Sequence, residues 1–428
     1  GCNAGRTCRR GGSPRGRRRW RADGCWCSVA GMLARSFASS ALVLSLCAAS
    51  ACGEAGKTDM KAAKAEVEVP PRVEPQPVTP AGPVVPAEEY AWDLPRGLKA
   101  PEVPADNPMT AAKVELGHAL FFDKRLSVDG TRSCYSCHQN ELGNADGRVK
   151  ALGPGDKILA RNTPTIWNVA YHAELYWDGR SKGLEKQMIG AWKGGNMGVG
   201  EANLAAKATE IGALPEYAEK FRAVFGAGAV TPERVAQAVS AYERTLLCGA
   251  TAWDSNSMAA EAQRGWELFR GKAACATCHS GDNFADGLYH RVGVGVPESG
   301  EGGDLGRFDA SKADVDKYKF RTPTLRNVGR TAPYFHDGSV ADLRAAVKQM
   351  AAGGNRKIKE IDSNLMDRAL TDAEVDDLVA FLKALDCPGQ LEVIGDQTVA
   401  GITPGTSSPA DARSETKGEA KGDKKKAG

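Results

Sequence analysis

Two short runs of the sequence place two cysteines and a histidine at a spacing that suits covalent haem attachment. Residues 134–138 and 275–279 both read Cys-x-x-Cys-His. Two thiols three residues apart can form thioether bonds with the two vinyl groups of one haem, and the adjacent histidine then supplies an axial nitrogen to the iron. The runs therefore predict two covalently bound haem c groups, held by Cys134, Cys137, His138, Cys275, Cys278 and His279.

The main alternative for these cysteines is a zinc site that uses both Cys-x-x-Cys pairs. The histidine that directly follows each pair, and a secretory segment near the start of the chain, favour haem. The function then depends on the iron face opposite each histidine. A sixth ligand from the protein makes an electron-transfer haem, whereas an open face allows peroxide to bind.

The elements that must position these motifs are predicted to be helices joined by long loops. One helix is expected before each motif, near residues 111–122 and 259–269. Thr231, followed by Pro and Glu, has the residues of a helix start. Thr371 and Glu374 form a capping box before another helix. No stretch alternates for long enough to predict a sheet.

The sequence repeats itself, which predicts one kind of domain used twice. The Thr-Pro-Thr segment at 163–165, the Asn-Val at 168–169 and the Asp-Gly at 178–179 each recur 159 residues later. Repeats of this kind indicate duplicated structure. We therefore predict a mainly α fold with two cytochrome c-like haem domains in tandem, at residues 96–250 and 251–390.

The segments outside these domains carry export and linker signals. Residues 1–31 are rich in Arg, Gly and Cys and are interpreted as upstream sequence that is not part of the working protein. Residues 32–51 have a basic start, a short apolar core and small residues before Cys52, which is typical of a secretory signal, with a buried helix as the alternative. Residues 52–95 and 391–428 are predicted to be a disordered tether and tail.

Export predicts a periplasmic location for the mature protein. Cys52 is expected either to follow ordinary signal cleavage or to be acylated, which would tether the protein to a membrane surface. Without residues 1–51 the chain has 47 basic and 52 acidic side chains, a net charge of −5. With this charge balance we do not expect a nucleic-acid partner.

Two cysteines remain outside both motifs and outside the export segments: Cys248 and Cys387. Both follow the ends of predicted helices, and an exported protein meets an oxidising compartment. We predict that they form a disulfide. The alternative is two unrelated buried thiols.

The chain resembles the bacterial di-haem cytochrome c peroxidases and the related MauG-type enzymes over residues 106–388. The matching segments are 116–127, 133–138, 162–165, 177–180, Gln187, 322–327 and 333–338. The resemblance implies that the N-terminal haem reacts with hydrogen peroxide. It also implies that the C-terminal haem accepts electrons from a small cytochrome c or copper protein.

The resemblance also assigns an iron ligand for the second haem. Met350 lies late in a helix opened by Ser339 and Asp342, where the peroxidases have a Met ligand and MauG-type members have Tyr. Leu343, Val347 and Met350 share a helical face, so core packing is the alternative role for Met350.

Two further assignments rest on the same resemblance. Trp177 matches a tryptophan that relays electrons between the haems, with a core aromatic as the alternative. Asn162, Thr331 and Pro333 match positions that bind one calcium ion between the domains, and few protein ligands completed by water suit this hard cation. The alternative for Asn162 is that it caps a turn.

The sequence departs from the family around the first haem. Many peroxidases have a second histidine sixteen residues after the proximal one, where this chain has Pro154. The family also has a distal glutamate shortly after the Gln187 position, which performs general acid–base work. Here the nearby carboxylate is Glu201, and Met197 offers a sulfur that would close the first haem. Trp177, Gln187 and Glu201 are the candidate catalytic residues.

Three functions follow from these observations. The first is reduction of hydrogen peroxide to water with electrons from a small redox protein. The second is MauG-like oxidation of a protein side chain by peroxide, which Met350 disfavours and Pro154 permits. The third is a non-enzymatic di-haem electron carrier. A monomer and a homodimer both remain open.

Overall fold

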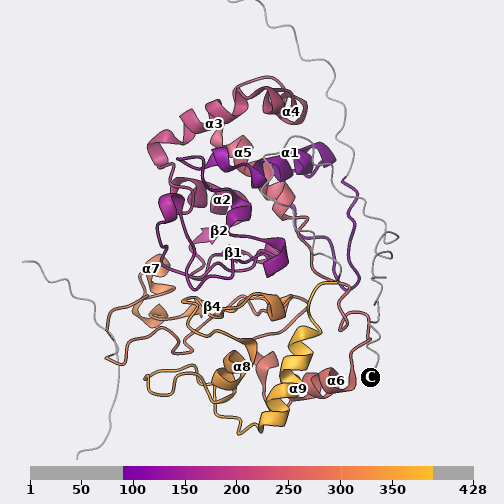
Figure 1. Cartoon of the computed structure of the whole chain (residues 1–428), viewed down its shortest axis with the longest axis vertical. Helices are drawn as coiled ribbons and strands as arrows, with labels where there is room; N and C mark the ends of the chain where they lie inside the picture. The colour runs from indigo at the N-terminus through magenta and orange to yellow at the C-terminus, as the bar shows by residue number, and fades with distance from the viewer. Residues whose placement is uncertain (1–89, 300, 389–428) are drawn as a thin grey trace, which may run out of the picture. The chain divides into compact units, whose positions relative to one another are not determined.

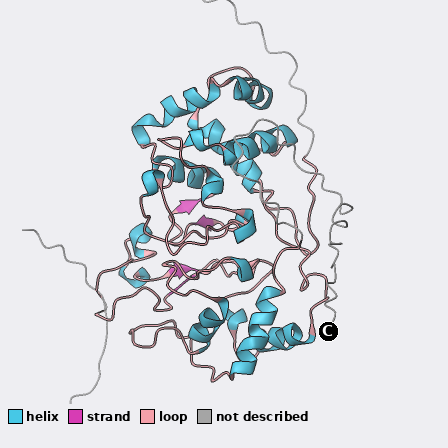
Figure 2. Cartoon of the chain, in the orientation of Figure 1, coloured by secondary structure: helices cyan, strands magenta, loops and turns pink. Residues whose placement is uncertain are grey.

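The computed structural model describes residues 90–299 and 301–388, and this part of the chain consists mainly of helices and loops (Figure 1, Figure 2). Its helices are α1 (Ala111–Phe122), α2 (Leu184–Lys193), α3 (Leu204–Gly212), α4 (Pro215–Phe225), α5 (Pro232–Glu243), α6 (Ala260–Arg270), α7 (Phe308–Ser311), α8 (Leu343–Ala351) and α9 (Asp372–Lys383). The prediction of a mainly α fold is confirmed. None of these helices has the length and apolar character that crossing a bilayer requires.

Strands contribute little to the fold. β1 (Glu174–Leu175) pairs antiparallel with β2 (Ser181–Lys182), and β3 (Tyr289–His290) pairs antiparallel with β4 (Phe320–Arg321). Each strand has two residues, which is too short to leave an alternating apolar pattern. This is why the sequence predicted none of them.

The segments predicted to lie outside the haem domains are mostly beyond the described residues. The upstream sequence (1–31), the secretory signal (32–51), Cys52, the tether up to residue 89 and the tail (391–428) all lie there.

The helix starts agree with the capping signals in the sequence. Thr231 caps α5 by accepting a hydrogen bond from the Arg234 N–H, and Thr371 and Glu374 form the predicted capping box of α9. α8 is capped by Asp342, which accepts from the Ala345 N–H. Ser339 takes no part in that cap, because its N–H donates to an Asp337 carboxylate oxygen. α1 and α6 precede the two haem motifs, as predicted.

α3 and α4 were not predicted individually, although Pro215 at the first position of α4 is a common helix-start signal. Their apolar faces join α1, α2 and α5 in one hydrophobic cluster, while α6, α8 and α9 form a second. Each half therefore has its own core.

Two helix crossings show that the halves share one architecture. Gly117 of α1 lies against α5 so closely that a Cβ atom there would be 1.9 Å from the Ala238 carbonyl oxygen. Gly265 of α6 lies against α9 in the same way, with its Cβ position 2.0 Å from the Asp377 oxygen. Glycine is required at both positions because backbone atoms occupy the space of a side chain. α5 thus corresponds to α9 at an offset of 139 residues.

The halves meet through exchanged hydrogen bonds. The Asn162 N–H donates to the His336 carbonyl oxygen, and the Arg321 N–H donates to the Trp177 carbonyl oxygen, both at 2.8 Å. Asn162 and Arg321 are equivalent in the repeat, and so are Trp177 and His336, because each pair is 159 residues apart. Contacts in which equivalent residues trade roles are the signature of a two-fold relation.

The predicted disulfide between Cys248 and Cys387 is confirmed, with a Cα–Cα distance of 5.4 Å. These cysteines follow α5 and α9 at the same offset of 139 residues, so the bond joins equivalent positions. Each cysteine N–H donates to an asparagine side chain of its own half, Asn168 or Asn327. The disulfide therefore lies on the approximate two-fold axis.

Replacing both Cys248 and Cys387 by Ser is expected to lower the free energy of unfolding by about 4 kcal/mol, because the bond closes a long loop in the unfolded chain. Urea unfolding of the haem-loaded proteins measures the effect. A reducing agent should lower the wild-type midpoint to that of the double variant and leave the variant unchanged. Equal midpoints for the oxidised wild type and the variant would contradict the prediction.

Candidate haem sites

Each Cys-x-x-Cys-His motif folds into one short turn. The segments Cys134–Ser136 and Cys275–Thr277 are 3-10 turns, and the N–H of the histidine that follows donates to the carbonyl oxygen of the first cysteine at 3.0 Å. The turn gathers two sulfur atoms and one imidazole within five residues. This is the local arrangement that covalent haem attachment needs.

The two histidines present the same ring nitrogen to an iron. His138 Nδ1 lies 3.0 Å from the Asn144 carbonyl oxygen, and His279 Nδ1 lies 2.9 Å from the Phe284 carbonyl oxygen. A carbonyl only accepts, so Nδ1 carries the proton and Nε2 keeps its lone pair. Burial lowers the pKa of both imidazoles, which favours the neutral form that binds metals.

The second motif opens onto a cavity of about 270 Å³. Cys275, Cys278 and His279 line it together with Met350 and mostly apolar side chains. Thr163 also lines it, and its buried hydroxyl has no hydrogen-bond partner. An apolar cavity with both cysteines, a ligating histidine and an unsatisfied hydroxyl at its wall fits a haem with polar propionates.

Met350 lies on the wall of this cavity, as the ligand assignment requires. Leu343 and Val347 of the same helix also line the cavity, so the shared face of α8 is turned toward the cofactor space. The assignment of Met350 as an iron ligand stays a prediction, and its thioether is a suitable donor.

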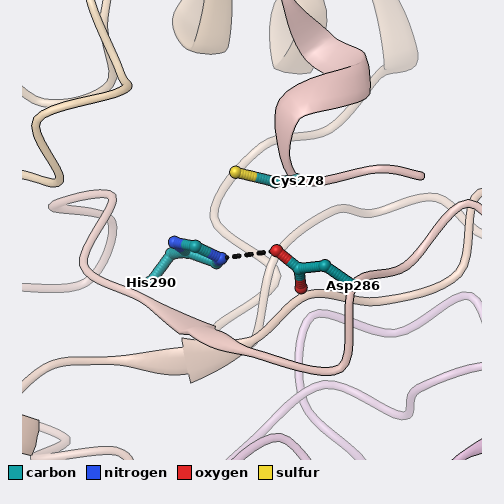
Figure 3. A group of neighbouring side chains, drawn as sticks. All are labelled: Cys278, Asp286 and His290. Carbon is teal, nitrogen blue, oxygen red and sulfur yellow. Dashed lines mark hydrogen bonds and ion pairs between the residues drawn. The ribbon is translucent and has the colours of Figure 1, made fainter.

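One cluster in the described part of the chain has the residue types of a metal site: Cys278, Asp286 and His290 (Figure 3). Both ring nitrogens of His290 face carboxylates, Nε2 at 2.9 Å from Asp286 and Nδ1 at 2.6 Å from Asp362. The Cys278 sulfur and these carboxylates raise the pKa of His290 to about 10. Haem attachment turns Cys278 into a thioether, which removes the largest cause of that rise. The two carboxylates still favour a proton on each ring nitrogen of His290, which leaves no lone pair for a metal.

The four motif cysteines do not gather at one point. Among residues 90–299 and 301–388, no other group of potential metal ligands is present besides that of Cys278. The alternative of a zinc site built from both cysteine pairs is therefore wrong.

The repeat identifies the residues that face the first haem. α2 and α8 are equivalent, because both begin at leucines that are 159 residues apart. Ala346 and Met350 of α8 line the second cavity, and their equivalents on α2 are Gln187 and Ala191. A methyl side chain cannot coordinate iron. α2 therefore has no thioether at the position equivalent to Met350, and its own methionine, Met188, stands at the position equivalent to Val347.

The candidate acid–base residue and the candidate iron ligand of the first haem, Glu201 and Met197, both follow the end of α2 in the chain. The Glu201 side chain is 73% exposed and forms an ion pair with Lys193 at 2.6 Å. Met197 is buried in the hydrophobic cluster of the first half. Pro154 lies against this loop, because a Cβ atom on Gly198 would be 3.2 Å from its ring. The roles of Glu201 and Met197 stay predictions, and the exposed position of Glu201 argues against direct chemistry at the haem.

Trp177 lies where the two halves meet. Its indole N–H donates to the Asn162 carbonyl oxygen at 2.9 Å, and its ring centroid is 6.5 Å from that of His336. Trp177 belongs to the first half in sequence and lines the cavity of the second haem. This is the position that a relay between the haems requires, although the relay itself stays a prediction.

The three calcium candidates, Asn162, Thr331 and Pro333, all line the second cavity. The amide of Asn162 is fixed, because its Nδ2 donates to the Arg148 carbonyl oxygen at 2.7 Å. Fixed oxygens suit calcium, and the assignment stays a prediction.

Sequence reasoning missed Glu243, a buried carboxyl at the end of α5. Burial raises its pKa to about 8, and one of its oxygens has no hydrogen-bond partner. The repeat contained the signal, because the equivalent residue of α9 is the apolar Leu382.

Comparison with known proteins agrees with this geometry. The family description "Di-haem cytochrome c peroxidase" matches residues 111–262, and "Cytochrome c" matches residues 262–386. Cytochrome-c peroxidase IdrP1 of Denitromonas iodatirespirans is 39% identical over 318 residues, covering 66% of this chain and 84% of that protein. Methylamine utilization protein MauG of Methylorubrum extorquens is 36% identical over 294 residues, covering 66% and 80%.

A solved structure shows the same fold. The crystal structure of a MauG-like protein associated with microbial copper homeostasis matches with a TM-score of 0.67 at 31% identity, over 72% of this chain and 99% of that one. The matches cover both haem motifs and the contact between the halves. The chain therefore belongs to the family of di-haem cytochrome c peroxidases and MauG proteins.

Proposed function

We propose that the protein is a di-haem peroxidase that reduces hydrogen peroxide to water with electrons from a small cytochrome c or copper protein. The observation that carries this proposal is the difference between equivalent positions of α2 and α8. Met350 lines the cavity of the second motif, whereas alanine stands at the equivalent position of α2, residue 191. One closed and one open iron face are what electron acceptance and peroxide binding require.

In this proposal His138 and His279 bind the irons, and Trp177 lies between the two halves. Bound haem supplies an iron that exchanges electrons and, where a coordination position is free, binds peroxide. His138 and His279 hold the irons through Nε2, because Nδ1 donates to a backbone carbonyl in both. Trp177 provides an aromatic ring between the halves, fixed by its hydrogen bond to Asn162.

Optical and electron paramagnetic resonance spectra of the fully oxidised protein test this proposal. We expect one low-spin haem, from His279 and Met350, and one high-spin haem that changes when peroxide is added. Peroxide should then oxidise a reduced small cytochrome c in steady state. Two low-spin haems that ignore peroxide would overturn the proposal and support the carrier function.

Two observations favour a second function. The 36% identity to MauG and Pro154, in place of a displaceable histidine, both agree with peroxide-driven oxidation of a protein side chain. Met350 argues against it, because MauG-type members have Tyr there. Turnover of peroxide with reduced cytochrome c separates the two functions, since a side-chain oxidase consumes peroxide without needing that donor.

The remaining proposals concern the setting of the enzyme. We propose a calcium ion at Asn162, Thr331 and Pro333, because the three residues line the same cavity. The calcium content of purified protein tests it. Export to the periplasm follows from the signal pattern of residues 32–51, with acylation of Cys52 as a second means of attachment. A homodimer remains a proposal that a sedimentation measurement decides.

A further inference from the structure

A peroxidase needs a proton donor beside the outer oxygen of peroxide. The buried aspartates of the first half, Asp123, Asp146 and Asp178, each form an ion pair with an arginine, whereas the buried Glu243 does not. Glu243 is 6% exposed at the last position of α5, and its Oε2 atom has no hydrogen-bond partner. A buried polar atom without a partner is costly unless something absent from the bare chain satisfies it. The atom therefore points to a ligand or cofactor.

The repeat places Glu243 at the cofactor space. α5 and α9 correspond at 139 residues, as the glycine crossings and the disulfide show. Leu382, the equivalent of Glu243, lines the second haem cavity together with Met350. Glu243 therefore takes the place of a cavity-lining leucine, on the helix that packs against α2.

Tyr176 is a second buried group that interacts electrostatically with Glu243. The Tyr176 hydroxyl donates to the Gln187 carbonyl oxygen at 3.1 Å, one helical turn before Ala191. Burial raises the pKa of Tyr176, and the nearby Glu243 carboxylate adds to the rise. Glu243 likewise adds to the raised pKa of Cys134, which burial dominates. Its carboxyl thus lies within electrostatic range of both the attachment site and α2.

From these observations we propose that Glu243 is the general acid of the first haem, in place of the distal glutamate that the family has shortly after the Gln187 position. This rests on the proposed peroxidase function. Glu243 gives its proton to the outer peroxide oxygen as the O–O bond breaks, and that oxygen leaves as water. The overall reaction consumes two protons and two electrons per peroxide. Glu243 supplies one proton and regains it from solvent, and the donor protein supplies both electrons.

The groups around Glu243 set the pH at which it works. Burial raises its pKa to about 8, while Arg244 of α5 opposes the rise and Glu185 of α2 adds to it. Lys113 of α1 interacts electrostatically with both Arg244 and Glu185. The acid is therefore protonated at neutral pH and loses its proton as the pH rises through about 8. Peroxide reduction should fall over that range.

The test compares Glu243→Gln and Glu243→Asp with the wild type. Gln keeps the size and loses the proton, so the second-order rate with peroxide should fall by ~10²-fold, while Asp should recover part of it. Azide binding to the oxidised first haem gives a readout independent of turnover. The wild-type affinity should weaken above pH about 8 as the carboxylate forms, and Glu243→Gln should lack that component.

Infrared spectra give the second readout. The C=O band of a protonated carboxyl should be present at neutral pH, vanish above pH about 8 and be missing from Glu243→Gln. Glu210→Gln is the matched control, because Glu210 is an exposed residue of α3 paired with Lys207. It should change none of these measurements.

Two outcomes overturn the proposal in distinguishable ways. If the wild type binds azide but Glu243→Gln matches it in pH profile and peroxide rate, Glu243 is not the acid and the peroxidase function stands. A large loss in Glu201→Gln instead would also reject Glu243. If the wild type binds no azide, the open haem is absent and both proposals fail.

Discussion

Replacing Ala191 by Met is expected to close the first haem and to reduce peroxide turnover by on the order of a hundredfold, equivalent to about 2.7 kcal/mol in activation free energy. Position 191 is the equivalent of Met350, so the substitution copies onto α2 the thioether that α8 carries. The high-spin signal of the oxidised protein should disappear, and azide should no longer bind. Optical spectra and steady-state turnover measure both effects.

The control for this variant is Ala205→Met on α3, an exposed position that receives the same side chain. It should retain the high-spin haem and full activity. If Ala191→Met kept both as well, the equivalence of α2 and α8 would be wrong at this position. The account of the open face would then fail.

Replacing Met350 by Leu is expected to remove a ligand with little change in packing, since the two side chains have similar volumes. The second haem should become high-spin, its reduction potential should fall, and turnover with a protein donor should drop by roughly tenfold or more. Redox titration and spectra of the oxidised protein measure the change.

Met366→Leu is the matched control, because Met366 is 51% exposed and lies outside the haem cavity. A spectrum of Met350→Leu identical to that of the wild type would show that Met350 only packs in the core. Peroxide binding at the first haem should survive in both variants, which separates the two haems experimentally.

The haem motifs and helix caps were predictable because their information is local. Five consecutive residues define each attachment site. Thr231 and Thr371 are N-cap residues, and each lies directly before the helix that it caps. The pairing of Cys248 with Cys387 could be predicted because these are the two cysteines left outside the haem motifs and the export segments, and because an exported protein meets an oxidising compartment. β1–β4 were not predictable, because two-residue strands form only where distant loops meet.

The site around the first haem was harder to predict, because its residues are defined by correspondence between distant segments. The register of 159 residues relates α2 to α8, whereas that of 139 relates α5 to α9. Glu243 becomes visible only when α5 is aligned with α9 and found opposite Leu382. Glu201 was considered because it is near in sequence, yet its side chain is in solvent beside Lys193.

The exchanged hydrogen bonds Asn162–His336 and Arg321–Trp177 show that the two haem-binding halves present equivalent backbone positions to each other. Apart from α3 and α4, which have no helical counterpart between α8 and α9, the two halves share one backbone plan. The difference in role between the two haems must then come from a few side chains that differ between equivalent positions. The chief pairs are 191 and 350, 177 and 336, and 243 and 382. Exchanging the residues within each of these three pairs should therefore reverse the direction of electron transfer between the two haems.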